Sequence, residues 1–387
     1  MGKNTVQDAI YLLSCAVNNK KAEPDRIKKM DLTAVYSLCS INSLTSAAYF
    51  AIEKSGYKPD EGSKAVLKKW QQERDKSIRR IMLMDAEREA LCTFLESKGI
   101  WYLPLKGIII KDMYPHPAMR RMADNDILFD SNYREQVHDY FVSRSYTVES
   151  YCSSNHDVYQ KKPIYNFEMH TALFSDFRSK VWADYYSDIM RLVQKKDGKN
   201  FEYEFLPEEF YIYFLCHAKK HHSGSGTGLR TLLDFYIINR YMSDTIDIDK
   251  IGDKLKELEI YEYENSSRAL AQKLFSEEFD FEELSEAEKA MLSRYTNSGT
   301  YGTVAQRVKN RVTEDNTKKP TRNRKIKYIF SRMFPSRAFM ENWCYREFKV
   351  GYKRPLLLPA AYIWRLIKSF FVKSSRWVGE LRAVKKL

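Results

Sequence analysis

The chain has 387 residues, 44% of them hydrophobic, and it carries 64 Lys and Arg against 51 Asp and Glu, a net charge of +13. This length allows two domains with cores of their own, and the composition is ordinary for a soluble protein. Six widely spaced cysteines without a CxxC pair argue against a disulfide framework, and the polar first residues argue against a signal peptide, so we expect a cytoplasmic protein.

Residues 1–98 are predicted to form an N-terminal helical domain. Apolar residues recur at helical spacing in 6–18, in 31–54 with interruptions, and in 62–98. The last helix is expected to stop at Gly99, because glycine adopts the left-handed conformation that commonly ends a helix. We expect these helices to cover a catalytic sheet.

Residues 99–205 mix strand and helix patterns and are predicted to form the catalytic core. Trp101–Leu105 is typical of a short buried strand, and Ile108–Met113 returns to a helix. Lys106 and Gly107 stand between them. Because glycine lets a ligand approach the backbone and a helix N-terminus offers free N–H groups, this junction is typical of a phosphate-binding site.

Arg120 and Arg121 follow a predicted turn at 114–117 and stand directly before an acidic pair. Two fixed positive charges at this point could bind a triphosphate or could neutralise the acids that follow. The sequence leaves both roles open.

Three carboxylates carry the main functional signal of this core. Asp124 and Asp126 lie at the start of the apolar run Ile127–Phe129, and Glu168 lies in a later predicted strand. Residues i and i+2 of a strand share a face about 7 Å apart, so both aspartates could ligate one or two Mg²⁺ ions. Two such ions can hold the attacking and leaving oxygens of a phosphoryl displacement. His170, on the same strand face as Glu168, could support it or be structural.

A lone Asp-x-Asp pair is most often a solvated turn, so its surroundings must decide. A helix is expected at 133–143, and strands are expected at 147–151, 157–161 and 164–173. The third acid therefore also falls on a strand, which favours a metal site.

Residues 206–300 are predicted to form a helical domain that begins at Pro207. His217 and His221 are four residues apart and share a helix face. Ala218 stands where a zinc metalloprotease motif needs Glu, so zinc is disfavoured.

Arg230 and Asp234 on the next predicted helix have the i, i+4 spacing of a structural ion pair. The glycine-rich run 223–228 precedes them. Arg230 could therefore also contact a nucleotide or an acceptor beside a mobile loop, and both interpretations stay open.

These motifs together resemble a known family. The series Leu105-Lys106-Gly107, Tyr114-Pro115, Arg120 or Arg121, Asp124-x-Asp126, Glu168-x-His170, Cys216-His217, His221, Leu229-Arg230, Leu233-Asp234, Phe334-Pro335 and Leu356–Pro359 resembles the uncharacterised nucleotidyltransferase family of bacteria, a branch of the polymerase β superfamily. The resemblance implies an α+β fold, with a polymerase β-like core of a small mixed sheet and flanking helices. Two positions depart from the usual pattern: Ile108 stands where the superfamily has Ser or Gly, and Asn125 stands where the family usually has an apolar residue.

The resemblance implies an enzyme that moves a nucleoside monophosphate from an NTP to an acceptor hydroxyl and releases pyrophosphate. Asp124 and Asp126 would hold Mg²⁺, or alternatively Mn²⁺, on the triphosphate, and Glu168 would complete the metal site. Nucleotide contacts would come from Lys106, Gly107, Arg120, Arg121, His170, His217, His221 and Arg230. The acceptor, whether a small molecule, a sugar, a protein or a nucleic acid, is not specified.

Two other functions stay open. A glycosyltransferase could use Asp-x-Asp to hold Mn²⁺ on a sugar nucleotide, although that fold normally begins with a nucleotide-binding α/β half and here about 100 largely helical residues come first. A catalytically silent scaffold or nucleic-acid-binding protein could keep the same fold. The intact acids Asp124, Asp126 and Glu168 argue against that.

Residues 301–387 hold the basic excess of the chain. From Arg307 to the end there are 22 Lys and Arg against 5 Asp and Glu, whereas the first 306 residues carry 42 against 46. A linker is expected at 307–327 and a basic amphipathic helix at 356–372, which Arg365 and Lys368 make too polar to span a membrane. This helix could dock on the catalytic core, lie on an anionic membrane as a peripheral contact, or bind nucleic acid.

Overall fold

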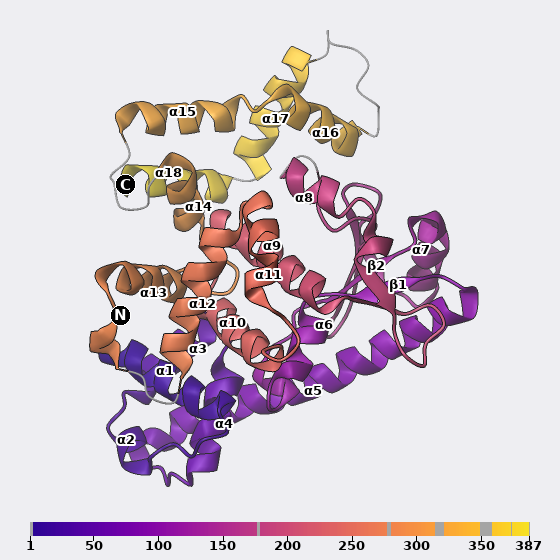
Figure 1. The fold of residues 1–387 in the computed structure, drawn as a ribbon. Helices are drawn as coiled ribbons and strands as arrows, with labels where there is room; N and C mark the ends of the chain where they lie inside the picture. The colour runs from indigo at the N-terminus through magenta and orange to yellow at the C-terminus, as the bar shows by residue number, and fades with distance from the viewer. Residues whose placement is uncertain are drawn as a thin grey trace. The chain divides into compact units, whose positions relative to one another are not determined.

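The computed structural model describes residues 3–175, 179–276, 280–313, 321–348, 358–372 and 374–386 (Figure 1). The chain forms two compact units, one of Met1–Lys219 with Gly228–Thr300 and the other of Lys220–Thr227 with Tyr301–Leu387. The architecture is α+β, as predicted, with a small mixed sheet among many helices.

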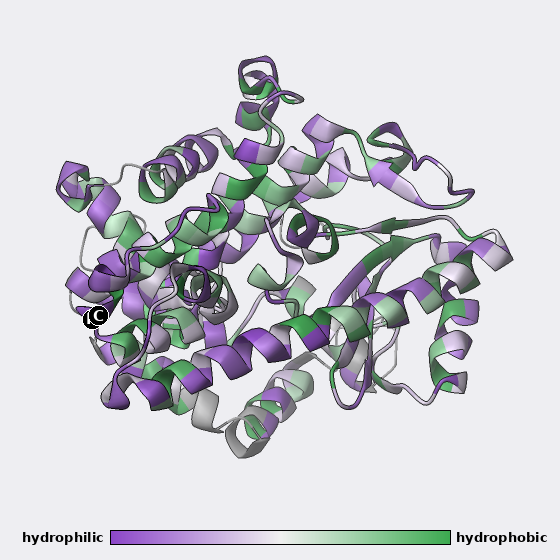
Figure 2. Ribbon diagram, turned by 90° about the horizontal axis from the view of Figure 1, so that it is seen from below, coloured by the Kyte–Doolittle hydropathy of each residue, from purple (hydrophilic) through white to green (hydrophobic). Residues whose placement is uncertain are grey.

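The first unit begins with helices. Asp60 caps the longest of them through its side chain, and Gly99 ends it in the left-handed conformation with φ 68°, as expected. This long helix alternates hydrophilic and hydrophobic residues along its length (Figure 2), the pattern of a helix buried on one side. The helices are α1 (Lys3–Val17), α2 (Pro24–Lys28), α3 (Leu32–Ile41), α4 (Thr45–Ser55) and α5 (Glu61–Lys98).

A five-stranded sheet follows, with strand order β1-β2-β5-β4-β3. Only β2 and β5 run parallel; the other neighbouring pairs are antiparallel. The strands and the short helices among them are β1 (Tyr102–Pro104), α6 (Gly107–Ile110), η1 (Lys111–Met113), η2 (Pro117–Met119), β2 (Asn125–Phe129), η3 (Ser131–Tyr133), α7 (Arg134–Ser143), β3 (Thr147–Ser150), β4 (His156–Lys161) and β5 (Tyr165–His170).

The two faces of this sheet belong to two hydrophobic cores. Ile127 and Met169 pack with residues of α5 and α7, while Leu128, on the opposite face of β2, joins the core that contains α1, α3 and α4. The helices of the first 98 residues are thus divided between both cores. Since side chains alternate along a strand, Asp126, Glu168 and His170 lie on the face away from α5 and α7.

The remainder of the first unit is mainly helical. Its helices contribute to the core that contains α1, α3 and α4. The small β6–β7 hairpin and the short α8 were not expected from the sequence. The elements are α8 (Lys180–Tyr185), η4 (Ile189–Arg191), β6 (Val193–Lys195), β7 (Tyr203–Phe205), α9 (Pro207–Ser223), whose last turn belongs to the second unit, α10 (Leu229–Tyr241), α11 (Ile248–Glu257), α12 (Tyr261–Phe275), η5 (Phe281–Glu283) and α13 (Glu286–Ser298).

The second unit is helical and has small cores of its own, around Tyr328 and around Met340. Glu380 accepts hydrogen bonds from Arg332 at 2.9 and 3.0 Å and joins two of its helices. In the parts of the chain that the structure describes, no helix combines the length and the apolar character of a membrane span. The helices are α14 (Val304–Val312), α15 (Arg322–Met333), α16 (Arg337–Phe348), α17 (Leu358–Val372) and α18 (Ser374–Lys386). The linker expected at 307–327 was wrong for most of its described residues, which are helical because Val308, Val312 and Tyr328 pack in one small core. Residues 314–320, within that range, and 356–357, at the start of the expected amphipathic helix, lie outside the described residues.

Candidate active site

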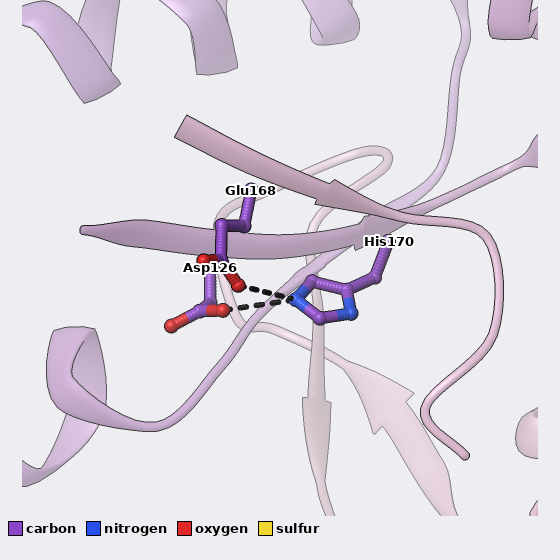
Figure 3. A group of neighbouring side chains, drawn as sticks. All are labelled: Asp126, Glu168 and His170. Atoms are coloured by element: carbon purple, nitrogen blue, oxygen red, sulfur yellow. Dashed lines mark hydrogen bonds and ion pairs between the residues drawn. The ribbon is translucent and has the colours of Figure 1, made fainter. Parts of the chain in front are cut away.

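The parallel pairing of β2 and β5 brings two of the predicted carboxylates together. Asp126 is the direct register partner of Glu168, and Leu128 is that of His170. One ligand atom from each of Asp126, Glu168 and His170 lies within 4.8 Å of the others, and Figure 3 shows the three side chains pointing toward one another. Asp124 immediately precedes β2, at the end of the strand where Asp126 lies.

Direct contacts join this group to Lys106. The His170 ring places Nε2 2.9 Å from Asp126 Oδ1 and 3.7 Å from Glu168 Oε2 (Figure 3). Lys106 donates from Nζ to the same Asp126 oxygen at 2.5 Å. Lys106 has a positive φ of 50°, an uncommon conformation for a residue with a side chain, and it stands at the turn between β1 and α6.

The electrostatics of the three acids differ sharply. Burial raises the pKa of Asp126, but the Lys106 ammonium and the His170 hydrogen bond outweigh it and hold that pKa well below the ordinary value. Burial and then the charge of Asp126 raise the pKa of Glu168 to about 8. The same two causes raise the pKa of Asp124 to about 6. Asp126 is therefore paired with positive groups, whereas Asp124 and Glu168 lack enough positive charge nearby to keep their ordinary pKa values.

This shortage fits a cation site. Two carboxylates and an imidazole converge on one point, with Asp124 next to them, and carboxylates ligate Mg²⁺ or Mn²⁺. A bound cation would offset the repulsion that raises the pKa values of Asp124 and Glu168. The donor set of the described residues thus suits the metal expected from the sequence.

Arg120 pairs with an acid that is far away in the sequence. It is buried, and its Nε and Nη2 donate to the two carboxylate oxygens of Asp234 at 2.8 and 3.0 Å. The hydroxyl of Tyr114 donates to the same Asp234 at 2.8 Å. This network joins the loop before β2 to α10, so Arg120 fixes the position of that loop.

Gly107 is enclosed by protein atoms. A Cβ at this position would lie 2.6 Å from Arg120 Nη1 and 2.7 Å from Met122 Sδ. A Cβ at this position would have to displace Arg120 or Met122, so the close packing favours glycine here. A contact between Gly107 and a phosphate, expected from the sequence, stays a prediction.

Asn125, which departs from the family pattern, is fully buried on the face toward α5. Its amide donates to the carbonyl of Met84 at 3.3 Å, and Arg88 donates to its side-chain oxygen at 3.3 Å. Two residues of α5 therefore satisfy this polar side chain where an apolar one is usual.

The remaining residues that the sequence predicts to contact the nucleotide are Arg230, Arg121, His217 and His221. The charge of Arg230 acts on Asp124, and its Nη1 donates to the backbone oxygen of Arg121 at 3.2 Å. Arg121 itself is partly exposed, with Nη1 3.9 Å from Glu73. His217 lies on α9 in the first unit, and His221 belongs to the second unit.

Tyr213 is a neighbour of the site that the sequence did not reveal. It is buried on α9, one turn before His217, and its ring centroid lies 6.3 Å from that of His217. Its pKa is raised mainly by burial and also responds to Lys106, Asp126 and Glu168. A signal was present, because residues 213 and 217 are four apart and share a helix face.

Comparisons with known proteins bear on the family of this chain. A family model described as an uncharacterised nucleotidyltransferase matches residues 28–276. A search of curated proteins found no match. Among solved structures, the chain is similar to an antigenic nucleotidyltransferase-like protein from Paracoccidioides brasiliensis, at 14% identity and a TM-score of 0.33, covering 49% of this chain and 91% of that chain.

Proposed function

The chain belongs to the uncharacterised nucleotidyltransferase family, and we propose that it transfers a nucleoside monophosphate from an NTP to an acceptor hydroxyl with release of pyrophosphate. The observation that carries the proposal is the register of β2 and β5, which makes Asp126 and Glu168 direct neighbours. Asp124, whose pKa responds to Asp126, adds the third acid that a two-metal site requires.

The residues of the chain would divide the work. Asp124 and Asp126 would hold divalent cations at the triphosphate, and Glu168 would complete the site and favour loss of the proton from the acceptor hydroxyl. Bound cations would neutralise the charge that spreads over the phosphate oxygens in an in-line displacement. Lys106 and Arg230 carry fixed positive charge beside these acids and would orient the phosphates.

His170 bears on the choice of metal. Magnesium prefers an all-oxygen shell, whereas Mn²⁺ accepts an imidazole nitrogen beside carboxylates. Because His170 Nε2 lies among the carboxylate oxygens, we expect Mn²⁺ to bind more tightly than Mg²⁺. Isothermal titration of the purified chain with each metal measures this, and His170→Gln should narrow the difference if the nitrogen is a ligand.

A transfer assay tests the reaction itself. The purified chain is incubated with Mg²⁺ or Mn²⁺, each α-labelled NTP and cell extract, and both labelled product and pyrophosphate are followed. Asp126→Asn should abolish labelling, and Asp139→Asn, an exposed acid on α7, should not. Labelling by Asp126→Asn at the parent rate would refute the catalytic role.

For the second unit we propose a peripheral contact with an anionic membrane. Ile326 and Phe330 of α15 and Phe334, directly after its end, follow one another at four-residue spacing and are all exposed. Phe334 also contacts Tyr362 of α17, with ring centroids 6.2 Å apart, and α17 exposes Trp364. Helix α15 carries five Lys and Arg and no acid, so the exposed apolar surface stands in a basic setting that favours anionic lipid headgroups.

Vesicle flotation tests this contact. The full chain should float with phosphatidylcholine vesicles that contain phosphatidylglycerol and should not float with phosphatidylcholine alone. Phe330→Ser should reduce flotation, whereas Lys69→Gln, on α5 of the first unit, should leave it unchanged. Equal flotation of the two variants would remove the proposal, and binding of the chain to single-stranded RNA instead of vesicles would replace it with the nucleic-acid alternative.

A further inference from the structure

A second polar pocket lies in the first unit, built by other residues than the carboxylate group. It has a volume of about 270 Å³, and helices α4 and α5 form most of its wall. Four cations line it, Lys76, Arg79, Arg80 and Arg121, against the one acid Glu73. Neither the proposed reaction nor the metal site uses this excess of positive charge.

The N-terminus of α4 also lines the pocket. The residue at its N-cap is Leu44, which has no polar side chain, and no side chain among the described residues caps the helix. The first N–H groups of an α-helix lack partners inside the helix and carry a partial positive charge. Thr45 and Ser46, in this first turn, are both pocket residues.

Ser46 supplies an independent sign of a ligand. The residue is only 4% exposed, and its hydroxyl is buried without a hydrogen-bond partner among the described residues. A buried polar group without a partner is costly, so such groups are rare in folded proteins unless a ligand or a water satisfies them. Ser46 lines the pocket together with Thr45 of the same uncapped turn and with the four cationic side chains, a combination that favours an anion.

We propose that this pocket is a second anion-binding site, which takes the phosphate group of a small phosphorylated molecule. Phosphate oxygens would accept hydrogen bonds from the first turn of α4 and from Ser46. Lys76, Arg79 and Arg80 on α5 would supply the charge. Glu73 lies 2.8 Å from Lys76 and 3.9 Å from Arg121, so it can hold these two cations in place before the anion enters. Such a site would bind phosphate without a divalent metal.

The test is thermal unfolding of the full chain with EDTA, at constant ionic strength, with inorganic phosphate, pyrophosphate or ATP replacing chloride. A ligand that binds the folded state raises the unfolding temperature. We expect a rise for the parent, and about tenfold weaker binding for Ser46→Ala and Lys76→Gln, each of which loses a hydrogen bond to a charged group. Lys69→Gln, elsewhere on α5, should respond like the parent.

Two further results separate this site from the carboxylates. Without phosphate, Ser46→Ala should unfold at the temperature of the parent or higher, because it removes a hydroxyl that has no partner. Asp126→Asn should keep the full phosphate response. The proposal is overturned if the parent shows no response to any of the three anions, if Ser46→Ala and Lys76→Gln respond fully, or if Asp126→Asn loses the response. A response to ATP and pyrophosphate alone would assign the site to a diphosphate, and an equal response to phosphate would assign it to a monophosphate group.

Discussion

Two acidic sites in the first unit, the single residue Asp234 and the group of Asp124, Asp126 and Glu168, differ in how their charge is paired. Asp234 receives two hydrogen bonds from Arg120 and one from Tyr114, so its charge is matched inside the protein. Asp126 is paired with Lys106 and His170, but Asp124 and Glu168 have too little positive charge beside them, and the pKa of Glu168 rises to about 8. The first arrangement stabilises a structure, whereas the second leaves negative charge available for a ligand.

The largest effect is expected for a variant that disrupts the group of Asp124, Asp126 and Glu168. Asp126→Asn removes a carboxylate that would hold a cation, and stabilisation by such a cation is worth several kcal/mol, so we expect nucleotide transfer to fall by about three orders of magnitude. The circular dichroism spectrum should stay that of the parent. Loss of the folded spectrum would mean that Asp126 is structural, like Asp234.

Asp234→Asn should have the opposite profile. It leaves Arg120 buried without its carboxylate, and breaking a buried pair on one side costs about 3 to 5 kcal/mol of unfolding free energy. Urea unfolding measures this loss. The double variant Asp234→Asn with Arg120→Met, which removes both charges, should recover a large part of it. No recovery would show that the interaction between the two charges is not what stabilises α10 against the loop.

Glu168→Gln should change how stability depends on pH when EDTA removes metals. The folded chain holds a proton on Glu168 up to about pH 8, whereas the unfolded chain releases it near the ordinary pKa of 4.5. Between these values the folded state binds more protons, so the stability of the parent falls as pH rises, by at most about 1.4 kcal/mol per pH unit for this group. The variant should lose this slope and be more stable than the parent at pH 8. Parallel stability curves for the two proteins would contradict the raised pKa.

The sequence predicted the elements of this comparison better than their connections. The strands around Asp126 and Glu168 follow from local periodicity, and the α+β class follows from the family resemblance, which is confirmed. The direct pairing of Asp126 with Glu168 depends on a parallel register between strands that are separated by two others in the chain, β3 and β4, which no local pattern specifies.

Arg120 shows that the sequence also does not reveal which charged side chains pair in the fold. Its position beside Asp124 suggested a partner among the nearby acids or a triphosphate, but Asp234, 114 residues further along, takes its guanidinium. A long side chain can reach many partners, and tertiary packing selects among them. The i, i+4 spacing predicts only a partner for Asp234 within its own helix, Arg230.

The smallest effect is predicted for Gly107, which lies next to a partner of each acidic site. Gly107 follows Lys106, which binds Asp126. A Cβ on Gly107 would collide with Nη1 of Arg120, whose Nε and Nη2 donate to Asp234. Met122 can move aside because its side chain is flexible, but Arg120 can move only by weakening its ion pair, so Gly107→Ala should cost about 1 to 3 kcal/mol of unfolding free energy. Urea unfolding measures this cost, with Gly198→Ala as a comparison, since a Cβ there meets no atom within 4 Å and the cost comes from its positive φ alone. If Gly107→Ala leaves the unfolding free energy unchanged, Arg120 is able to shift. The Arg120–Asp234 pair would then be less rigid than its contrast with Asp124, Asp126 and Glu168 requires.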